Sequence, residues 1–187
     1  MSETLFECVN NQVIQLSHRW QIHCDLFDSG PENIELLNNS GSIVFEFFQK
    51  LIVDDAIMAL SRLTDPPSNG TNKDNANIRH LIRCAQHSLA QDKIDQLHTM
   101  LKQLDGYMEN VRTHRSKALA HADLNHSLGD PLPGITYDDL ERAIGMCQKI
   151  MHALGTNLYD CQPNYNVTVP FGSGVPQLFT CLRKAHG

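Results

Sequence analysis

The sequence of 187 residues has few aromatic residues, no closely spaced pair of cysteines and no run of 18 apolar residues. With 6% aromatic residues, it offers few side chains on which nucleic-acid bases could stack. Without a long apolar run it is not expected to span a membrane. The first residues carry neither the basic nor the apolar segment of a signal peptide, so we expect a cytoplasmic protein.

Cysteines and histidines are present, but not in the spacings that bind metals. The six cysteines form no CxxC pair, which argues against a zinc ribbon and favours reduced, mostly buried thiols. The ten histidines form no HxxxH or HExxH pattern, so we expect neither a metal nor another cofactor. The net charge of −6 argues against a broad basic face for duplex nucleic acid, but it leaves room for a small basic pocket.

Apolar residues recur at steps of three and four along segments that contain no proline, which predicts amphipathic helices. The predicted helices cover about 3–27, 33 or 42 to 63, 75–89, 91–120 and 136–159. The second has a broad apolar face and is therefore expected to be central, and the stretch 38–41 is a candidate interruption of its start. Four to five such helices with short links predict an all-α, up-and-down bundle.

We expect two parts along the chain. The helical bundle is predicted to cover residues 1–162. A short, irregular C-terminal tail follows over 163–187, with some strand character at its start and a candidate short helix over 176–184. The tail is expected to dock on the bundle or to be partly disordered.

Arg115 falls where the apolar stripe of the helix at 91–120 should continue, so its guanidinium needs an anion or another partner there. His121 follows closely, and a proton shuttle beside a fixed positive charge is what metal-free RNA cleavage needs. On a straight helix the two lie about 120° apart and about 9 Å along the axis. Either Arg115 reaches across, the helix breaks near 119–122, or two subunits build the site. His114 shares a face with His121 and is a candidate second participant.

The pattern Arg115-Ser-Lys-x-x-Ala-His121-Ala-Asp123, together with the segment 59–65 that closes the second helix, resembles the abortive-infection U-type (AbiU-like) branch of the HEPN superfamily. The resemblance covers roughly residues 5–160. It implies a homodimeric bundle whose two Arg/His motifs face each other in a cleft. It also implies a metal-independent endoribonuclease of an antiphage defence or toxin–antitoxin system. Single-stranded RNA is then the expected substrate, and an antitoxin or defence-system protein is a candidate partner.

Within this resemblance, His121 would act as general acid or base and Arg115 would hold the charge of the phosphorane, while Asp123 would orient the imidazole. Ser116 stands where many active relatives carry Asn, Asp or His; a serine can donate a hydrogen bond but cannot serve as acid or base. Lys117 belongs to a local basic cluster with Lys102 and Arg112. Arg62 and Asp65 are candidates for supporting the cleft from the second helix.

Two other interpretations remain open. In the first, the chain is a noncatalytic HEPN module that binds RNA, a nucleotide or a partner protein. In the second, it is a structural dimerisation bundle in which Arg115 binds helix-end carbonyls and His121 caps the helix. Arg62 and Asp65 would then form a helix-end salt bridge and a loop cap. If His121→Ala abolishes RNA cleavage, the enzyme interpretation is favoured over both of these alternatives.

Overall fold

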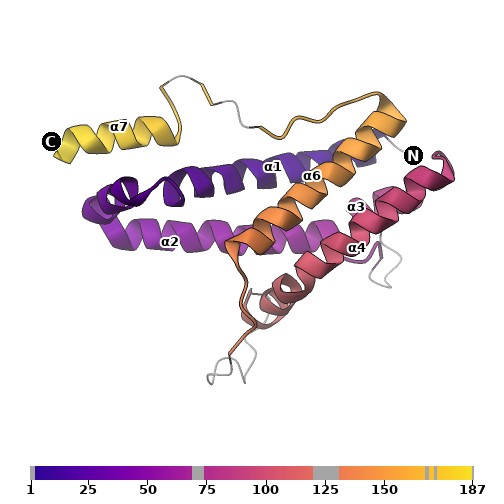
Figure 1. Cartoon of the computed structure of the whole chain (residues 1–187), viewed down its shortest axis with the longest axis horizontal. Coiled ribbons are helices and arrows are strands. Elements are labelled where there is room, and N and C mark those ends of the chain that lie inside the picture. The colour runs from indigo at the N-terminus through magenta and orange to yellow at the C-terminus, as the bar shows by residue number, and fades with distance from the viewer. Residues whose placement is uncertain (1–2, 69–73, 120–130, 167–168, 171, 187) are drawn as a thin grey trace.

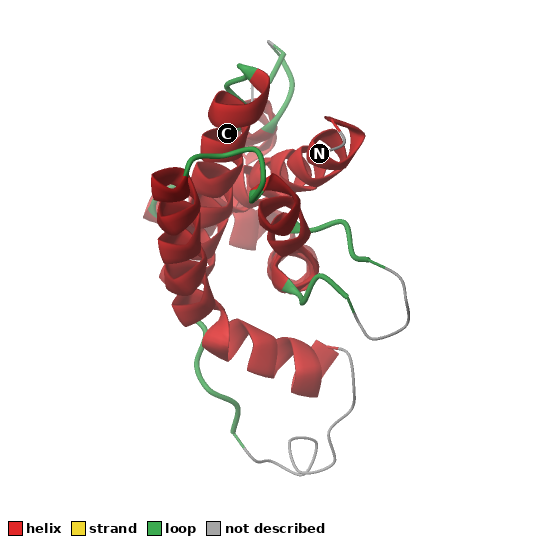
Figure 2. Ribbon diagram, turned by 90° about the vertical axis from the view of Figure 1, so that its right-hand side faces the viewer, coloured by secondary structure: helices red, strands yellow, loops and turns green. Residues whose placement is uncertain are grey.

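The computed structural model describes residues 3–68, 74–119, 131–166, 169–170 and 172–186. These residues form an all-α bundle in which no β-strand occurs, as the ribbon in Figure 2 shows. The structure thus confirms the predicted fold class. None of the helices within the described ranges is long and apolar enough to cross a membrane.

The bundle consists mainly of two helical pairs. Helix α1 (Glu3–Phe27) packs along α2 (Pro31–Thr64), and α4 (Gln91–His114) packs along α6 (Tyr137–Tyr159). Figure 1 shows the second pair running obliquely to the first. The short helix α3 (Ile78–Ala85) contacts α1, α2 and α6. One continuous apolar core joins α1, α2, α3, α4 and α6, so these helices form a single packed unit.

Helices α1 and α6 form where the sequence predicts them. Helix α1 buries one stripe of residues spaced three or four apart, among them Val9, Val13 and Leu16. The start of α6 is fixed by Thr136, whose hydroxyl accepts a hydrogen bond from the Asp139 amide at 3.1 Å. The Asp139 carboxylate in turn accepts from the Thr136 amide at 3.2 Å, which completes a capping box.

Helix α2 differs from the prediction in its first half. It is kinked at Gly41, whose φ of +153° lies in a region that other residues rarely adopt, as the candidate interruption at 38–41 suggested. Directly after the kink, five large apolar side chains are 43–79% exposed, so the prediction of a central helix is wrong here. We call these residues the apolar stripe: Ile43, Val44, Phe47, Phe48 and Leu51. Only further along, at Ile57, Leu60 and Leu63, does the helix enter the core.

The tail ends in a regular helix, α7 (Val175–His186), which includes the candidate helix at 176–184. It contacts α1 and α2 at the end of the bundle away from α4 (Figure 1). Leu26, Leu37, Val175 and Phe179 form a small core of their own there. At its end, His186 Nε2 lies 2.9 Å from the Ser40 hydroxyl.

Helix α4 is shorter than the predicted 91–120. It ends at His114, and residues Arg115–Leu119 continue as a π-helical turn, η1. Such wider turns are rare and occur often at functional sites. The turn begins at the arginine that the sequence singles out.

Candidate functional site

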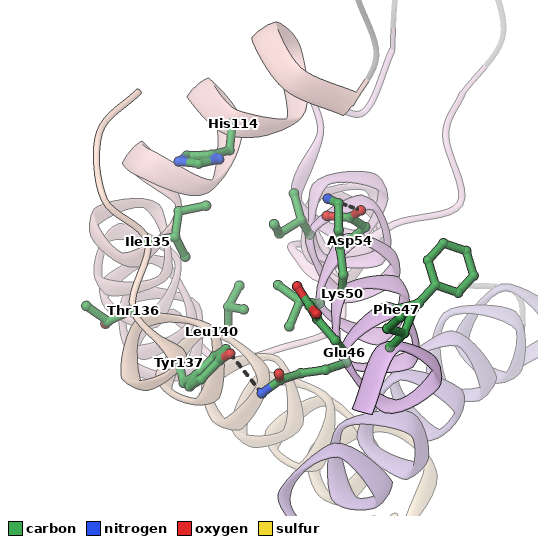
Figure 3. A pocket seen from close by; sticks show the side chains of 13 residues that line it. Glu46, Phe47, Lys50, Asp54, His114, Ile135, Thr136, Tyr137 and Leu140 are labelled. Carbon is green, nitrogen blue, oxygen red and sulfur yellow. Dashed lines mark hydrogen bonds and ion pairs between the residues drawn. The ribbon is translucent and has the colours of Figure 1, made fainter. Parts of the chain in front are cut away.

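A groove of about 890 Å³ lies between α2 and the region where α4 ends and α6 begins (Figure 3). It continues past His114 along η1 into a second hollow of about 430 Å³, which shares Lys50, Asp54 and His114 with the first. We call the two hollows together the α2–α4 groove. The groove runs alongside the residues in which the sequence places the candidate site.

The α2 wall of the groove carries charged side chains. Lys50 Nζ lies 2.8 Å from Asp54 Oδ2, and Glu46 stands one turn before Lys50 (Figure 3). The Gln49 side-chain amide donates a hydrogen bond to the Tyr137 hydroxyl at 3.2 Å, which links α2 to the start of α6. Sequence reasoning missed this wall. Its signal was the recurrence of Glu46, Lys50 and Asp54 every four residues in the part of the helix that also carries the apolar stripe.

His114 lies on the opposite side of the groove from Lys50 and Asp54 (Figure 3). Its Nε2 lies 2.5 Å from the carbonyl oxygen of Pro133. A carbonyl only accepts hydrogen bonds, so Nε2 carries the proton, and in the neutral ring Nδ1 is left as an acceptor. His114 thus ties the end of α4 to the segment that precedes α6 and borders both hollows of the groove.

Arg115, the next residue, contacts the residue that directly follows α2. Its Nη2 lies 3.9 Å from Asp65 Oδ2, which is an ion pair but too long for a hydrogen bond. The Arg115 Nε is buried and has no hydrogen-bond partner in the described part of the chain. A guanidinium that has a loose counterion and an unused donor is suited to donate a hydrogen bond to a phosphate oxygen.

The rest of the local basic cluster is divided between ion pairs and solvent. The Arg112 guanidinium donates to Asp105 Oδ1 at 2.7 Å, and Arg79 donates to the same oxygen. Burial by itself would raise the pKa of Asp105, but the hydrogen bonds from the two arginines outweigh it and lower this pKa below its ordinary value. Lys117 is exposed, and so is Ser116 beside it. The two cations of η1 therefore differ from Arg112, because Lys117 is exposed and Arg115 is only loosely paired. Both remain available to bind an anion.

The other candidates from the sequence are not all gathered at one place. Asp65 does lie beside Arg115, but Arg62 lines a separate hollow of about 270 Å³ with Arg19 and Gln15. His121 and Asp123 lie outside the described residues. The relation between Arg115 and His121 therefore stays a prediction.

Among the described residues, no group of three or more His, Cys, Asp or Glu side chains lies close enough together to hold a metal ion. In comparisons with known proteins, the family model HEPN_AbiU2, described as AbiU2, matches residues 3–173. Neither the curated proteins nor the solved structures give a match.

Proposed function

The chain belongs to the AbiU2 family of HEPN domains, and on this premise we propose that it is a metal-independent endoribonuclease of an antiphage defence or toxin–antitoxin system. Arg115 and His121 would form its catalytic pair at a cleft between two subunits. Single-stranded RNA would be the substrate. The family itself is related to abortive infection.

The observation that carries this proposal is the state of the Arg115 side chain. Buried polar groups are nearly always hydrogen-bonded, so a buried Nε that lacks a described partner calls for an explanation. A non-bridging oxygen of an RNA phosphate would supply the partner. When the phosphate becomes a phosphorane it gains negative charge, and a guanidinium already in place lowers the barrier; removing one such donor typically slows a reaction by about 10²–10³-fold.

The remaining chemistry is proton transfer. His121 would take the proton from the RNA 2′-hydroxyl or give one to the leaving 5′-oxygen, a contribution of about 10²–10⁴-fold in typical enzymes. Asp123 would orient its ring. Lys117 in η1 would attract a neighbouring phosphate and Ser116 would donate a hydrogen bond. His114 would contribute through Nδ1, because its Nε2 already serves Pro133.

The apolar stripe supports the dimer. Soluble monomers rarely expose contiguous apolar patches of more than a few hundred square ångströms. Two copies related by a two-fold axis present the same surface to each other, so the stripe would be buried against its own copy. Since Ile43 and Phe47 both belong to the stripe and line the α2–α4 groove, the second copy would also close one side of that groove.

Cleavage of a labelled single-stranded RNA pool in the presence of EDTA tests the proposal. Wild type should cut the RNA and leave 2′,3′-cyclic phosphate ends, while Arg115→Ala and His121→Ala should not. Arg142→Ala is the matched control, because Arg142 forms an exposed ion pair with Asp138 within α6. Equal cleavage by all four proteins would reject the site. No cleavage by folded, dimeric wild type would reject the enzyme and favour a binding module.

Such a binding module is the second candidate, and the charges of the groove favour it. Glu46 and Asp54 place two carboxylates on the wall beside Lys50, which suits a cationic protein segment better than a phosphate backbone. Under this alternative, Glu46→Gln would weaken binding of a partner protein and leave RNA affinity unchanged. Pull-down of a co-expressed defence-system protein, compared with RNA binding by fluorescence anisotropy, would distinguish the two.

A further inference from the structure

The backbone that follows α2 is held by side chains from the start of α3. Carbonyl oxygens of three successive residues, Thr64, Asp65 and Pro66, all accept hydrogen bonds from this region. Arg79 Nε donates to the Thr64 carbonyl at 2.9 Å, and the Asn77 amide donates to the Asp65 carbonyl at 2.9 Å. Asn77 also lies 3.3 Å from the Pro66 carbonyl. The end of α2 therefore has little freedom to move relative to α3.

Asn77 makes this attachment rigid. Its side chain is fully buried, and its oxygen accepts a hydrogen bond from the His80 amide at 2.9 Å, which caps α3. One amide group thus fixes the start of α3 with its oxygen and the end of α2 with its nitrogen. A shift of either helix end would leave buried polar atoms without partners, which is unfavourable.

Arg79 extends the attachment to α4. Its Nε donates to the Thr64 carbonyl, while its Nη2 donates to the Asp105 carboxylate. The same carboxylate oxygen also accepts a hydrogen bond from Arg112 at 2.7 Å. The Arg79 side chain is only 26% exposed. A planar guanidinium offers donors in fixed directions, so one side chain sets the spacing between the end of α2 and the middle of α4.

These contacts meet at the pair Asp65 and Arg115. Asp65 follows Thr64, the residue that Arg79 holds, and Arg115 directly follows α4, the helix that Arg79 also holds. Resting on the proposed function above, we propose that Arg79 is a positioning residue. By joining the end of α2 to α4, it holds Asp65 at the distance that keeps the Arg115 guanidinium oriented and available for phosphate.

Substitution of Arg79 tests this inference on the full-length protein. Arg79→Lys keeps the positive charge but cannot serve Thr64 and Asp105 from one rigid plane. We expect kcat for RNA cleavage to fall about tenfold or more with little change in KM, because misplacement by 1 Å can reduce a rate by about 10²-fold. Arg83→Ala is the matched control: Arg83 lies one turn later on α3 and pairs with exposed Asp74 instead. An unchanged kcat in Arg79→Lys would overturn the inference.

A double-mutant cycle checks that Arg79 acts through Asp65. In the Asp65→Asn background, Arg79→Lys should reduce kcat by less than twofold further, because the pair that it positions is already lost. If the two substitutions instead reduce kcat by factors that multiply, Arg79 supports the fold in general, and the inference would be wrong. Circular dichroism and thermal unfolding establish that each variant is folded.

A second readout does not depend on RNA cleavage. Hydrogen exchange of the Arg115 Nε–H, followed by NMR and assigned with Arg115→Lys, reports directly on how this side chain is held. We expect exchange at least tenfold faster in Arg79→Lys than in wild type, and no change in Arg83→Ala. If wild type cleaves no RNA but exchange rises as stated, the enzyme proposal fails while the positioning stands. If exchange does not change, the positioning is wrong whatever the activity.

Discussion

Arg115 faces Asp65 where α2 ends and η1 begins, with 3.9 Å between Nη2 and the carboxylate oxygen Oδ2. This spacing provides charge neutralisation at Nη2 without a hydrogen bond, so Asp65 leaves the other donors of the guanidinium free for a phosphate. We predict that Arg115→Lys lowers the single-turnover cleavage rate about as much as Arg115→Ala, by about 10²–10³-fold. Full activity in Arg115→Lys would show that a point charge suffices.

The apolar stripe leads to a prediction about assembly. Phe47 is 63% exposed at the middle of the stripe. If the stripe is the dimer interface, Phe47→Asp places a charge there and removes apolar contact worth about 1.5–3 kcal/mol per buried side chain. Both copies in a two-fold dimer lose this contact, so the dissociation constant should rise by roughly 10²–10⁴-fold. Light scattering coupled to size exclusion should show a dimer for wild type and a monomer for Phe47→Asp.

The matched control for this prediction is Gln96→Asp, which introduces the same side chain at an exposed position of α4. It should remain a dimer. A wild-type protein that is monomeric at high micromolar concentration would contradict the role given to the stripe, as would a Phe47→Asp variant that still dimerises.

His23 predicts a dependence of stability on pH. It is buried against Trp20 and Tyr137, with ring centroids 4.7 and 5.0 Å away, and neither of its ring nitrogens has a hydrogen-bond partner among the described residues. Burial lowers the pKa of His23 below its ordinary 6.5, against the opposing charge of Asp28. The unfolded chain therefore binds this proton more readily. The contribution of neutral His23 to the free energy of unfolding is fully present above pH 6.5, and it declines as the pH falls below that value.

His23→Phe should remove this contribution. The ring still packs between Trp20 and Tyr137, and two buried polar atoms disappear, which is often neutral or stabilising. We expect the drop in melting temperature between pH 7.5 and pH 5 to be smaller in His23→Phe than in wild type. His87→Phe, a change at an exposed histidine, is the control, and an equal reduction there would show that His23 is not the cause.

Two glycines of α6 should respond to alanine in opposite ways. A Cβ on Gly155 would lie 2.8 Å from the backbone oxygen of Cys161 and 3.2 Å from the Phe6 ring, so Gly155→Ala should cost about 1–3 kcal/mol of unfolding free energy. A Cβ on Gly145 would meet no described atom within 4 Å beyond its own helix and chain neighbours. Gly145→Ala should therefore stabilise the protein by up to about 1 kcal/mol. Urea denaturation of both variants tests the pair.

The sequence predicts well those elements whose signal is local. Helix α1 shows one stripe of apolar residues, and α6 begins at a threonine with an aspartate three residues later, so both were predicted to within a residue or two. The π-helical turn was not predicted, because the rotation that sets Arg115 beside Asp65 depends on contacts between α2 and η1. Arg115 nevertheless continues the three- and four-residue spacing of the buried residues of α4, which indicated that its guanidinium needs a partner.

The first half of α2 shows why pattern alone fails at surfaces. Its apolar residues are as regular as those of α1, and periodicity cannot distinguish a face buried inside one chain from a face that is left for another. The same limit applies to the groove. Lys50 and Asp54 meet His114 only through the packing of helices that are some 60 residues apart in the sequence. The contacts by which Asn77 and Arg79 hold the end of α2 likewise depend on how the helices pack, so periodicity does not predict them.

The small core under α7 makes the end of the chain separable from the rest. Residues 3–173 match the family model, and α7 begins two residues later, on apolar contacts that the main core does not share. Regions held by few buried contacts detach at a lower free energy than the whole molecule unfolds. Limited proteolysis ahead of Val175 should therefore release the last helix and leave a bundle that melts as a unit. In evolution, such a helix can be gained, lost or replaced without redesigning the domain that carries it.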